Sequence, residues 1–175
     1  PVGGSNHIGE LGYIECMREI TEYNNQKIFS HIISASGSGG THSGLIVGKK
    51  YYKYNTNIIG ISVKDNKKVQ EEKVLKLAKS ACNFVKCAYP EKQDIMVLDE
   101  YVGDGYGVPT IGMKKALRLL AEKEAILLDP VYSGKAFDGF LDLVNKKYFK
   151  KTDRVLFIHT GGSVSLSAYE WAFQE

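Results

Sequence analysis

A glycine-rich segment carries the residue types best suited to chemistry in this sequence. Residues 36–44 read SGSGGTHSG, and they lie between the apolar runs 31–35 and 45–47. This order predicts a strand that ends in a glycine turn, from which a helix begins. Glycines let the backbone approach a ligand closely, and free N–H groups at a helix start attract a dianion. The segment therefore predicts a phosphate-binding loop, to which Ser38, Thr41 and Ser43 add hydroxyl groups.

Other glycine motifs match this segment less well. A dinucleotide-binding loop needs Gly-x-Gly-x-x-Gly, but His42 stands where the third glycine belongs. That alternative stays open because Asp65 lies about where a ribose-binding acid is expected. A P-loop needs a lysine where the chain has Leu45. A nucleophile elbow centred on Ser38 lacks its first glycine, which makes serine hydrolysis a poor match. A purely structural glycine turn is a further alternative.

The composition describes one globular unit. The chain has 175 residues, of which 43% are hydrophobic and 25% are charged, and its formal net charge is +3. This length favours a single domain over 1–175 with a sizeable core. The small and dispersed charge argues against a nucleic-acid partner. No apolar run approaches the roughly 20 residues that span a bilayer, so we expect no membrane partner.

The cysteines indicate a reducing compartment. The sequence has three cysteines, an odd number, and they lack the C-x-x-C spacing of metal sites: Cys16, Cys82 and Cys87. We therefore expect free thiols and a cytoplasmic protein. We expect no metal, because no group of His, Cys, Asp and Glu has the spacing of a metal site.

Apolar periodicity switches repeatedly between helical and strand character. The pattern predicts helices over about 5–23, from the glycine turn through Gly48 to about 52, and over about 67–87, 109–121 and 134–144. It predicts strands over about 28–35, 57–63, 95–98 and 154–159, and a glycine-rich loop over 101–110. This alternation predicts an α/β fold, in which a mostly parallel sheet is covered by helices on both faces. Ligands of such sheets bind at the carboxyl ends of the strands, where the glycine turns would lie.

Four motifs in a fixed order give the chain a family resemblance. They are SGSGGTHSG at 36–44, YVGDGYGVPT at 101–110, DPVYSGK at 129–135 and HTGG at 159–162. Together they resemble the pyridoxal-phosphate family of D-cysteine desulfhydrase and 1-aminocyclopropane-1-carboxylate deaminase. The resemblance implies the tryptophan-synthase-β-like fold, also called fold type II, with pyridoxal 5'-phosphate as cofactor and a homodimeric enzyme. This chain resembles the C-terminal part of that fold, mainly its large domain.

The resemblance also assigns roles to individual residues. Those implied to hold the cofactor are Ser38, Gly39, Gly40, Thr41 and Thr160. Tyr106 and Tyr132 match family tyrosines on the substrate side of the cofactor and are the catalytic candidates. Ser133 and Thr160 bear on specificity, because the deaminase pattern has an acid and a leucine there. A hydroxyl at Ser133 cannot hold the pyridine nitrogen protonated as an acid would, and this suits β-elimination.

The implied reaction is β-elimination from a small amino acid. We expect D-cysteine to give pyruvate, ammonia and hydrogen sulfide in the full-length parent. The alternatives are a 1-aminocyclopropane-1-carboxylate deaminase and a non-catalytic phosphate- or nucleotide-binding module. The family's Schiff-base lysine lies in an N-terminal motif that this chain lacks, so we expect the chain alone to be inactive. Lys135 is expected to be a solvated lysine, and Ser5, Asn6 and His7 are left out of the site.

Overall fold

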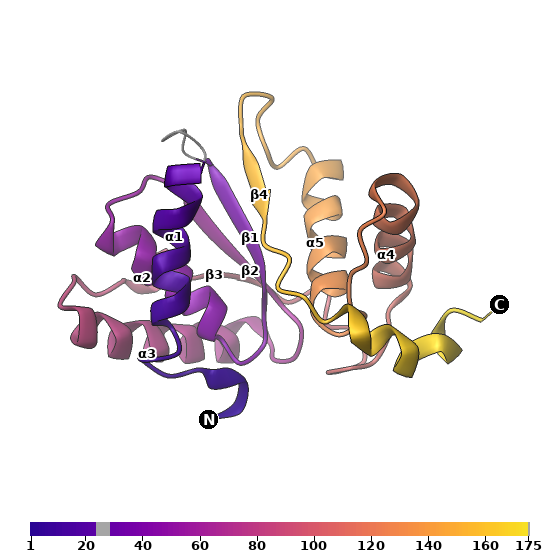
Figure 1. The fold of residues 1–175 in the computed structure, drawn as a ribbon, viewed down its shortest axis with the longest axis horizontal. Coiled ribbons are helices and arrows are strands. Elements are labelled where there is room, and N and C mark those ends of the chain that lie inside the picture. The colour runs from indigo at the N-terminus through magenta and orange to yellow at the C-terminus, as the bar shows by residue number, and fades with distance from the viewer. Residues whose placement is uncertain (24–28, 175) are drawn as a thin grey trace.

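The computed structural model describes residues 1–23 and 29–174, which form an α/β fold (Figure 1). Its helices are α1 (Leu11–Tyr23), α2 (Gly40–Tyr51), α3 (Lys67–Val85), α4 (Ile111–Glu124) and α5 (Ser133–Asn145). Its strands are β1 (His31–Ser36), β2 (Asn57–Ser62), β3 (Met96–Leu98) and β4 (Val155–Phe157). Short 3-10 helices lie at η1 (Val2–Gly4), η2 (Lys92–Asp94) and η3 (Ser163–Ala172).

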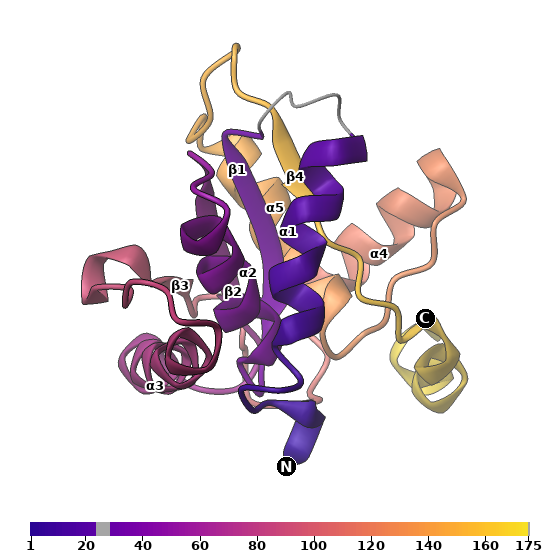
Figure 2. The ribbon, with the colours of Figure 1, turned by 60° about the vertical axis from the view of Figure 1, so that its left-hand side comes forward.

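The four strands form one parallel sheet in the order β3-β2-β1-β4. The pairing of β1 with β2 runs from His31 opposite Asn57 to Ser36 opposite Ser62. Helices α1, α2 and α3 lie on one side of the sheet, and α4 and α5 lie on the other (Figures 1 and 2). The predicted parallel sheet with helices on both faces is therefore confirmed.

The alternation of side chains along the strands divides the core into two layers. Ile32 and Ile58 belong to the buried cluster that includes residues of α1, α2 and α3. Their neighbours Ile33 and Ile59 belong to the cluster beneath α5. Strand β1 is buried along its whole length because it is central in a sheet covered on both faces. The glycine loop therefore follows directly after a strand that packing fixes on both faces.

Several element boundaries differ from the sequence prediction. Helix α1 begins at Leu11 rather than at Ser5 or Asn6. The side chain of Asn6 accepts hydrogen bonds from the N–H groups of Ile8 and Gly9, and this holds a turn before the helix. Helix α4 begins after Thr110, whose hydroxyl accepts from the Met113 N–H and caps the first turn.

The strands are shorter than the apolar runs that predicted them. Strand β4 covers Val155–Phe157 of the expected 154–159. Strand β1 begins at His31, and the earlier part of the predicted strand includes residue 28, which lies outside the described residues. Among the helices that the structure describes, none is long and apolar enough to cross a membrane.

Candidate functional site

The glycine loop lies between β1 and α2, at the carboxyl end of the central strand. Gly39 precedes the first residue of α2 and has a φ of 96°, a left-handed conformation that favours glycine. A Cβ on Gly37 would lie 2.8 Å from the ring carbon Cε1 of Tyr132. Glycine at position 37 therefore lets an aromatic ring pack closely against the loop.

The loop forms one wall of a cavity of about 220 Å³. The residues that line this cavity are Gly3, Ala35, Gly37, Ser38, Gly39, Thr41, Tyr132 and Thr160. Thr160 follows β4, Tyr132 precedes α5 and Gly3 lies in η1, so with the glycine loop four separate segments meet there. The structure thus brings together Ser38, Gly39 and Thr41, which the sequence predicted to bind phosphate, with Thr160 and Tyr132. We call this space the loop cavity.

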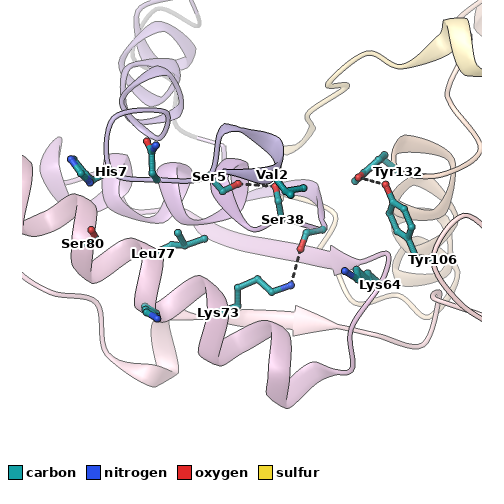
Figure 3. Close-up of a pocket in the computed structure, with 13 residues that line it drawn as sticks. Val2, Ser5, His7, Ser38, Lys64, Lys73, Leu77, Ser80, Tyr106 and Tyr132 are labelled. Carbon is teal, nitrogen blue, oxygen red and sulfur yellow. Dashed lines mark hydrogen bonds between the residues drawn. The ribbon is translucent and has the colours of Figure 1, made fainter.

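Ser5 occupies a hydrogen-bonding position in the predicted phosphate loop. Its hydroxyl accepts a hydrogen bond from the Gly40 N–H at 3.1 Å and donates one to the Ser38 hydroxyl at 2.7 Å. Figure 3 shows the Ser5 and Ser38 side chains pointing toward each other. A hydroxyl oxygen is therefore bound to one of the N–H groups predicted for a phosphate. Sequence reasoning left Ser5 out of the site, and Gly40 makes room for it, since a Cβ there would lie 2.6 Å from the Ser5 hydroxyl oxygen.

A second cavity of about 600 Å³ adjoins the first and shares Gly37, Ser38 and Tyr132 with it. Its other lining residues are Val2, Ser5, Asn6, His7, Lys64, Lys73, Lys76, Leu77, Ser80 and Tyr106. Figure 3 shows these side chains converging from the N-terminal segment, α3 and the tyrosine pair. Lys64 and Lys76 give this larger cavity a cationic lining that suits an anionic ligand, whereas the charge of Lys73 is balanced by Asp65.

Lys73 supports the glycine loop from α3. Its ammonium group donates to the Gly37 carbonyl oxygen at 3.1 Å, and it also contacts the Asp65 carboxylate. Asp65 was the candidate ribose-binding acid of the dinucleotide alternative. Because its carboxylate is paired with Lys73, this geometry disfavours that role.

The two candidate catalytic tyrosines form a pair. The hydroxyl groups of Tyr106 and Tyr132 are hydrogen-bonded to each other, and their ring centroids lie 5.7 Å apart in an edge-on arrangement. Burial and the contact with Tyr106 raise the pKa of Tyr132. The Tyr132 phenol is therefore protonated at neutral pH and can donate a hydrogen bond into either cavity.

A carboxylate turn positions Tyr132 at the start of α5. The Asp129 side chain is buried and accepts hydrogen bonds from the N–H groups of Val131 and Tyr132, at 2.8 and 2.7 Å. It also accepts from the N–H and the hydroxyl of Ser133, at 2.7 and 2.6 Å. Four donors on one carboxylate fix the backbone that carries the tyrosine. Sequence reasoning quoted Asp129 only as part of a motif and gave it no role.

The Ser133 side chain is engaged inside this turn. Its hydroxyl donates to the Asp129 carboxylate and accepts from the Asp129 N–H at 2.8 Å. The residue is 1% exposed and does not line the loop cavity or the larger cavity. Its role in specificity stays a prediction, and any contact with a ligand requires this hydroxyl to exchange partners.

Lys135 is buried, so the expectation of a solvated lysine is wrong. Its ammonium group donates to the carbonyl oxygens of Val102 and Gly105, at 2.6 and 2.9 Å. Burial lowers its pKa, an effect that Asp104 opposes. Lys135 ties the loop at 101–110 to α5, and thereby holds Tyr106 beside Tyr132.

His42 belongs to the core beneath the loop. Its Nδ1 atom lies 3.1 Å from the Ser36 hydroxyl, and burial lowers its pKa to about 4. Gly60 on β2 leaves room for the ring, since a Cβ there would lie 2.1 Å from Nδ1. Gln70 completes this buried support by donating to Ser36 and to the Gly37 carbonyl oxygen. His42 is therefore a neutral histidine that braces the loop from below.

The geometry of the loop cavity fits a phosphate monoester. Thr41 lies in the first turn of α2, where helix geometry leaves N–H groups without partners in the helix. These groups and the helix dipole attract an anion, and Ser38 and Thr41 add hydroxyl donors. The adjoining larger cavity has room for an aromatic ring attached to that phosphate.

Comparison with known proteins agrees with this geometry. A family model described as pyridoxal-phosphate dependent enzyme matches residues 1–161. A D-cysteine desulfhydrase of Serratia proteamaculans is 42% identical over 171 residues, which are 97% of this chain and 51% of that protein. A D-cysteine desulfhydrase of Klebsiella pneumoniae is 41% identical over 170 residues, again 51% of its length. The chain thus spans about half the length of the curated relatives it matches.

Solved structures give the same result for the fold. The crystal structure of an ACC deaminase homologue superimposes with a TM-score of 0.86 at 32% identity, over 99% of this chain and 52% of that one. A fungal L-serine ammonia-lyase from Rhizomucor miehei superimposes with a TM-score of 0.61 at 15% identity, over 94% of this chain and 56% of its own. The fold is that of the fold type II pyridoxal-phosphate enzymes, and pyridoxal phosphate is the family's cofactor. The family match over residues 1–161 establishes that this chain belongs to the pyridoxal-phosphate dependent enzymes.

Proposed function

We propose that this chain supplies the phosphate-binding loop and the tyrosine pair of an enzyme that performs β-elimination on a small amino acid. D-Cysteine is the proposed substrate, and pyruvate, ammonia and hydrogen sulfide are the proposed products. The observation that carries this proposal is the loop cavity, where Ser38, Gly39 and Thr41 meet Thr160 and Tyr132. The curated relatives named D-cysteine desulfhydrase support the choice of substrate.

The proposed division of labour follows from the geometry. When bound, pyridoxal phosphate withdraws electrons from the α-carbon of an amino acid and so permits loss of a proton and a β-substituent. The loop binds the phosphate group through its N–H groups and the hydroxyls of Ser38 and Thr41, and so orients the cofactor. Tyr132 lines both cavities, and its hydroxyl is hydrogen-bonded to that of Tyr106, which lines the larger one. The Tyr132 phenol can donate a hydrogen bond to the sulfur that leaves the substrate, and its raised pKa makes it a hydrogen-bond donor rather than the acid that protonates this sulfur.

We propose that the Schiff-base lysine lies in a portion of the full-length protein that corresponds to the part of the relatives outside the match. Lys135 and Lys73 are poor substitutes, because both ammonium groups already donate to backbone carbonyl oxygens of the site. In this proposal 1–175 is one α/β domain, the C-terminal portion of an enzyme with a further N-terminal portion. We also propose a homodimer in the cytoplasm.

A second candidate activity is deamination of 1-aminocyclopropane-1-carboxylate. The superposition on an ACC deaminase homologue with a TM-score of 0.86 supports it. A hydroxyl at Ser133 favours β-elimination instead, provided that it leaves the Asp129 carboxylate, because a neutral group beside the cofactor makes it a weaker electron sink. The two activities therefore differ in what they require of the residue at position 133.

A substrate panel on the full-length protein distinguishes these candidates. We expect pyruvate and sulfide from D-cysteine and little 2-oxobutyrate from the cyclopropane acid. Formation of 2-oxobutyrate alone would reverse the assignment. Borohydride reduction of the cofactor-loaded protein, followed by peptide mapping, then locates the modified lysine. A modified lysine within 1–175 would contradict the proposed division between the two portions.

A further inference from the structure

Two cysteines meet where α3 ends. Cys82 lies in the last turn of α3, and Cys87 follows the helix cap at Lys86, which has a left-handed φ of 56°. The Cys87 N–H donates to the Cys82 carbonyl oxygen at 3.1 Å, which closes the turn. The Cys87 thiol in turn donates to the Cys82 sulfur, and the two sulfur atoms lie 3.1 Å apart. The chain reversal therefore holds the two thiols in direct contact.

The two thiols have different surroundings. Cys82 is fully buried among Ile14, Val47, Ala78 and Ala81, and its thiol donates to the Ala88 carbonyl oxygen at 3.4 Å. Burial, together with the hydrogen bond and charge interaction with Cys87, raises the pKa of Cys82 to about 12. Cys87 is only partly buried. A small oxidant from solvent therefore reaches Cys87 first, and Cys82 stands behind it.

We propose that Cys82 and Cys87 form a redox site, which a hydroperoxide converts from a dithiol to a disulfide. The Cys87 sulfur attacks one peroxide oxygen, the O–O bond breaks, and a sulfenic acid forms as one water or alcohol leaves. The Cys82 sulfur then attacks the Cys87 sulfur, the S–O bond breaks, and a water leaves with the Cys82 proton. The thiols together lose two electrons, and the peroxide gains them.

This proposal is independent of the proposed function. Gln70 and Lys73 contact the glycine loop from the opposite end of α3, whereas the two cysteines lie at and beyond its last turn. The redox state of the pair can therefore be measured without an activity assay. Cys16 lies on α1 and is the remaining cysteine, which makes it the internal control.

Peptide mapping tests the proposal because trypsin cleaves between the two cysteines. Cleavage after Lys79, Lys86 and Lys92 separates peptide 80–86, with Cys82, from peptide 87–92, with Cys87. The purified protein is treated with hydrogen peroxide, free thiols are blocked with iodoacetamide, and the digest is analysed without reduction. We expect the two peptides to appear joined, lighter by two hydrogens than their sum, and to separate after dithiothreitol. Cys16, in peptide 1–18, should stay alkylated.

Variants identify the order of events. Cys82→Ser should leave a sulfenic acid on Cys87 that dimedone traps, whereas Cys87→Ser should give no dimedone adduct on Cys82. Cys16→Ser should form the joined peptides as the unchanged protein does. Alkylation of both Cys82 and Cys87 after peroxide, or pairing of Cys87 with another molecule, would overturn the proposal. The map of the unchanged protein decides this even if a variant fails to fold.

Discussion

The loop from β1 into α2 and the turn into α5 both place groups at the loop cavity, but by different means. The first uses the backbone itself, with Gly39 in a left-handed conformation and the N–H groups of the next helical turn, among which that of Gly40 donates to Ser5. The second uses side chains, because Asp129 organises four donors and Lys135 spans to a loop some thirty residues away in sequence. Backbone sites follow from local residue types, whereas side-chain supports depend on which segments the fold brings together.

Loss of the Asp129 carboxylate should have the largest effect. Asp129→Ala leaves the N–H groups of Val131, Tyr132 and Ser133 without their acceptor at a buried helix start. We expect a destabilisation of about 3 kcal/mol in urea unfolding. Asp129→Asn is the control, because it retains one acceptor oxygen and should lose less. Equal stability of Asp129→Ala and the unchanged protein would remove the supporting role given to this turn.

Glu10 precedes α1 and carries a buried carboxyl group that makes the stability of the fold depend on pH. Its carboxyl is fully buried, and neither oxygen has a hydrogen-bond partner within 3.5 Å among the residues that the structure describes. Burial raises its pKa from 4.5 to about 7, an effect that the nearby Ser43 hydroxyl opposes. A raised pKa means that the native state favours the protonated form. Stability is therefore complete below pH 4.5 and falls as the pH rises through 7, by an amount on the order of 3 kcal/mol.

Glu10→Gln should remove this pH dependence. We expect the variant to match the unchanged protein near pH 5 and to exceed it in stability at pH 8, since glutamine carries no charge to bury. Urea unfolding at both pH values measures the difference. Glu22→Gln, which removes the exposed partner of Arg18 on α1, is the surface control. Identical profiles for Glu10→Gln and the unchanged protein would show that Glu10 stays ionised without penalty.

Substitution of Lys135 tests whether its long side chain holds the loop at 101–110 in place. Lys135→Met keeps the aliphatic stem but removes both hydrogen bonds to the loop at 101–110. We expect a loss of about 2 kcal/mol in unfolding free energy and faster hydrogen exchange in that loop. Lys115→Met on the exposed face of α4 should change stability by less than about 0.5 kcal/mol. Unchanged hydrogen exchange at 101–110 would show that Lys135 does not hold Tyr106 in place.

Substitution of Gly39 tests the glycine loop between β1 and α2, and we expect it to change stability least among these variants. Gly39→Ala places a Cβ at a φ of 96° and 3.0 Å from Leu77, so we expect a loss of about 1 kcal/mol. Its effect on phosphate affinity should be larger, about tenfold, because the loop must shift. Gly12→Ala on α1, where a Cβ meets nothing within 4 Å, should not destabilise the protein. Calorimetric titration with pyridoxal phosphate and urea unfolding measure the two effects.

The parts of the molecule that local sequence determines were predictable. Alternating apolar residues gave the order of strands and helices, and glycines located the loop within 36–44, although α2 already begins at Gly40. The start of α1 was missed because Asn6 holds a local turn with its side chain. Ser5 and Lys135 were missed because their partners, Gly40 and Val102, lie more than thirty residues away. Such contacts depend on tertiary packing, which periodicity and motif spacing do not encode.

Amide chemical shifts during a titration with pyridoxal phosphate test the central claim most directly. In a ¹⁵N-labelled sample, we predict that the largest changes occur at the N–H groups of Ser38, Gly39, Gly40 and Thr41. Inorganic phosphate should move the same four signals, whereas pyridoxal without phosphate should not. Signals at 38–41 that stay in place while others move would contradict the assignment of this loop as the phosphate site.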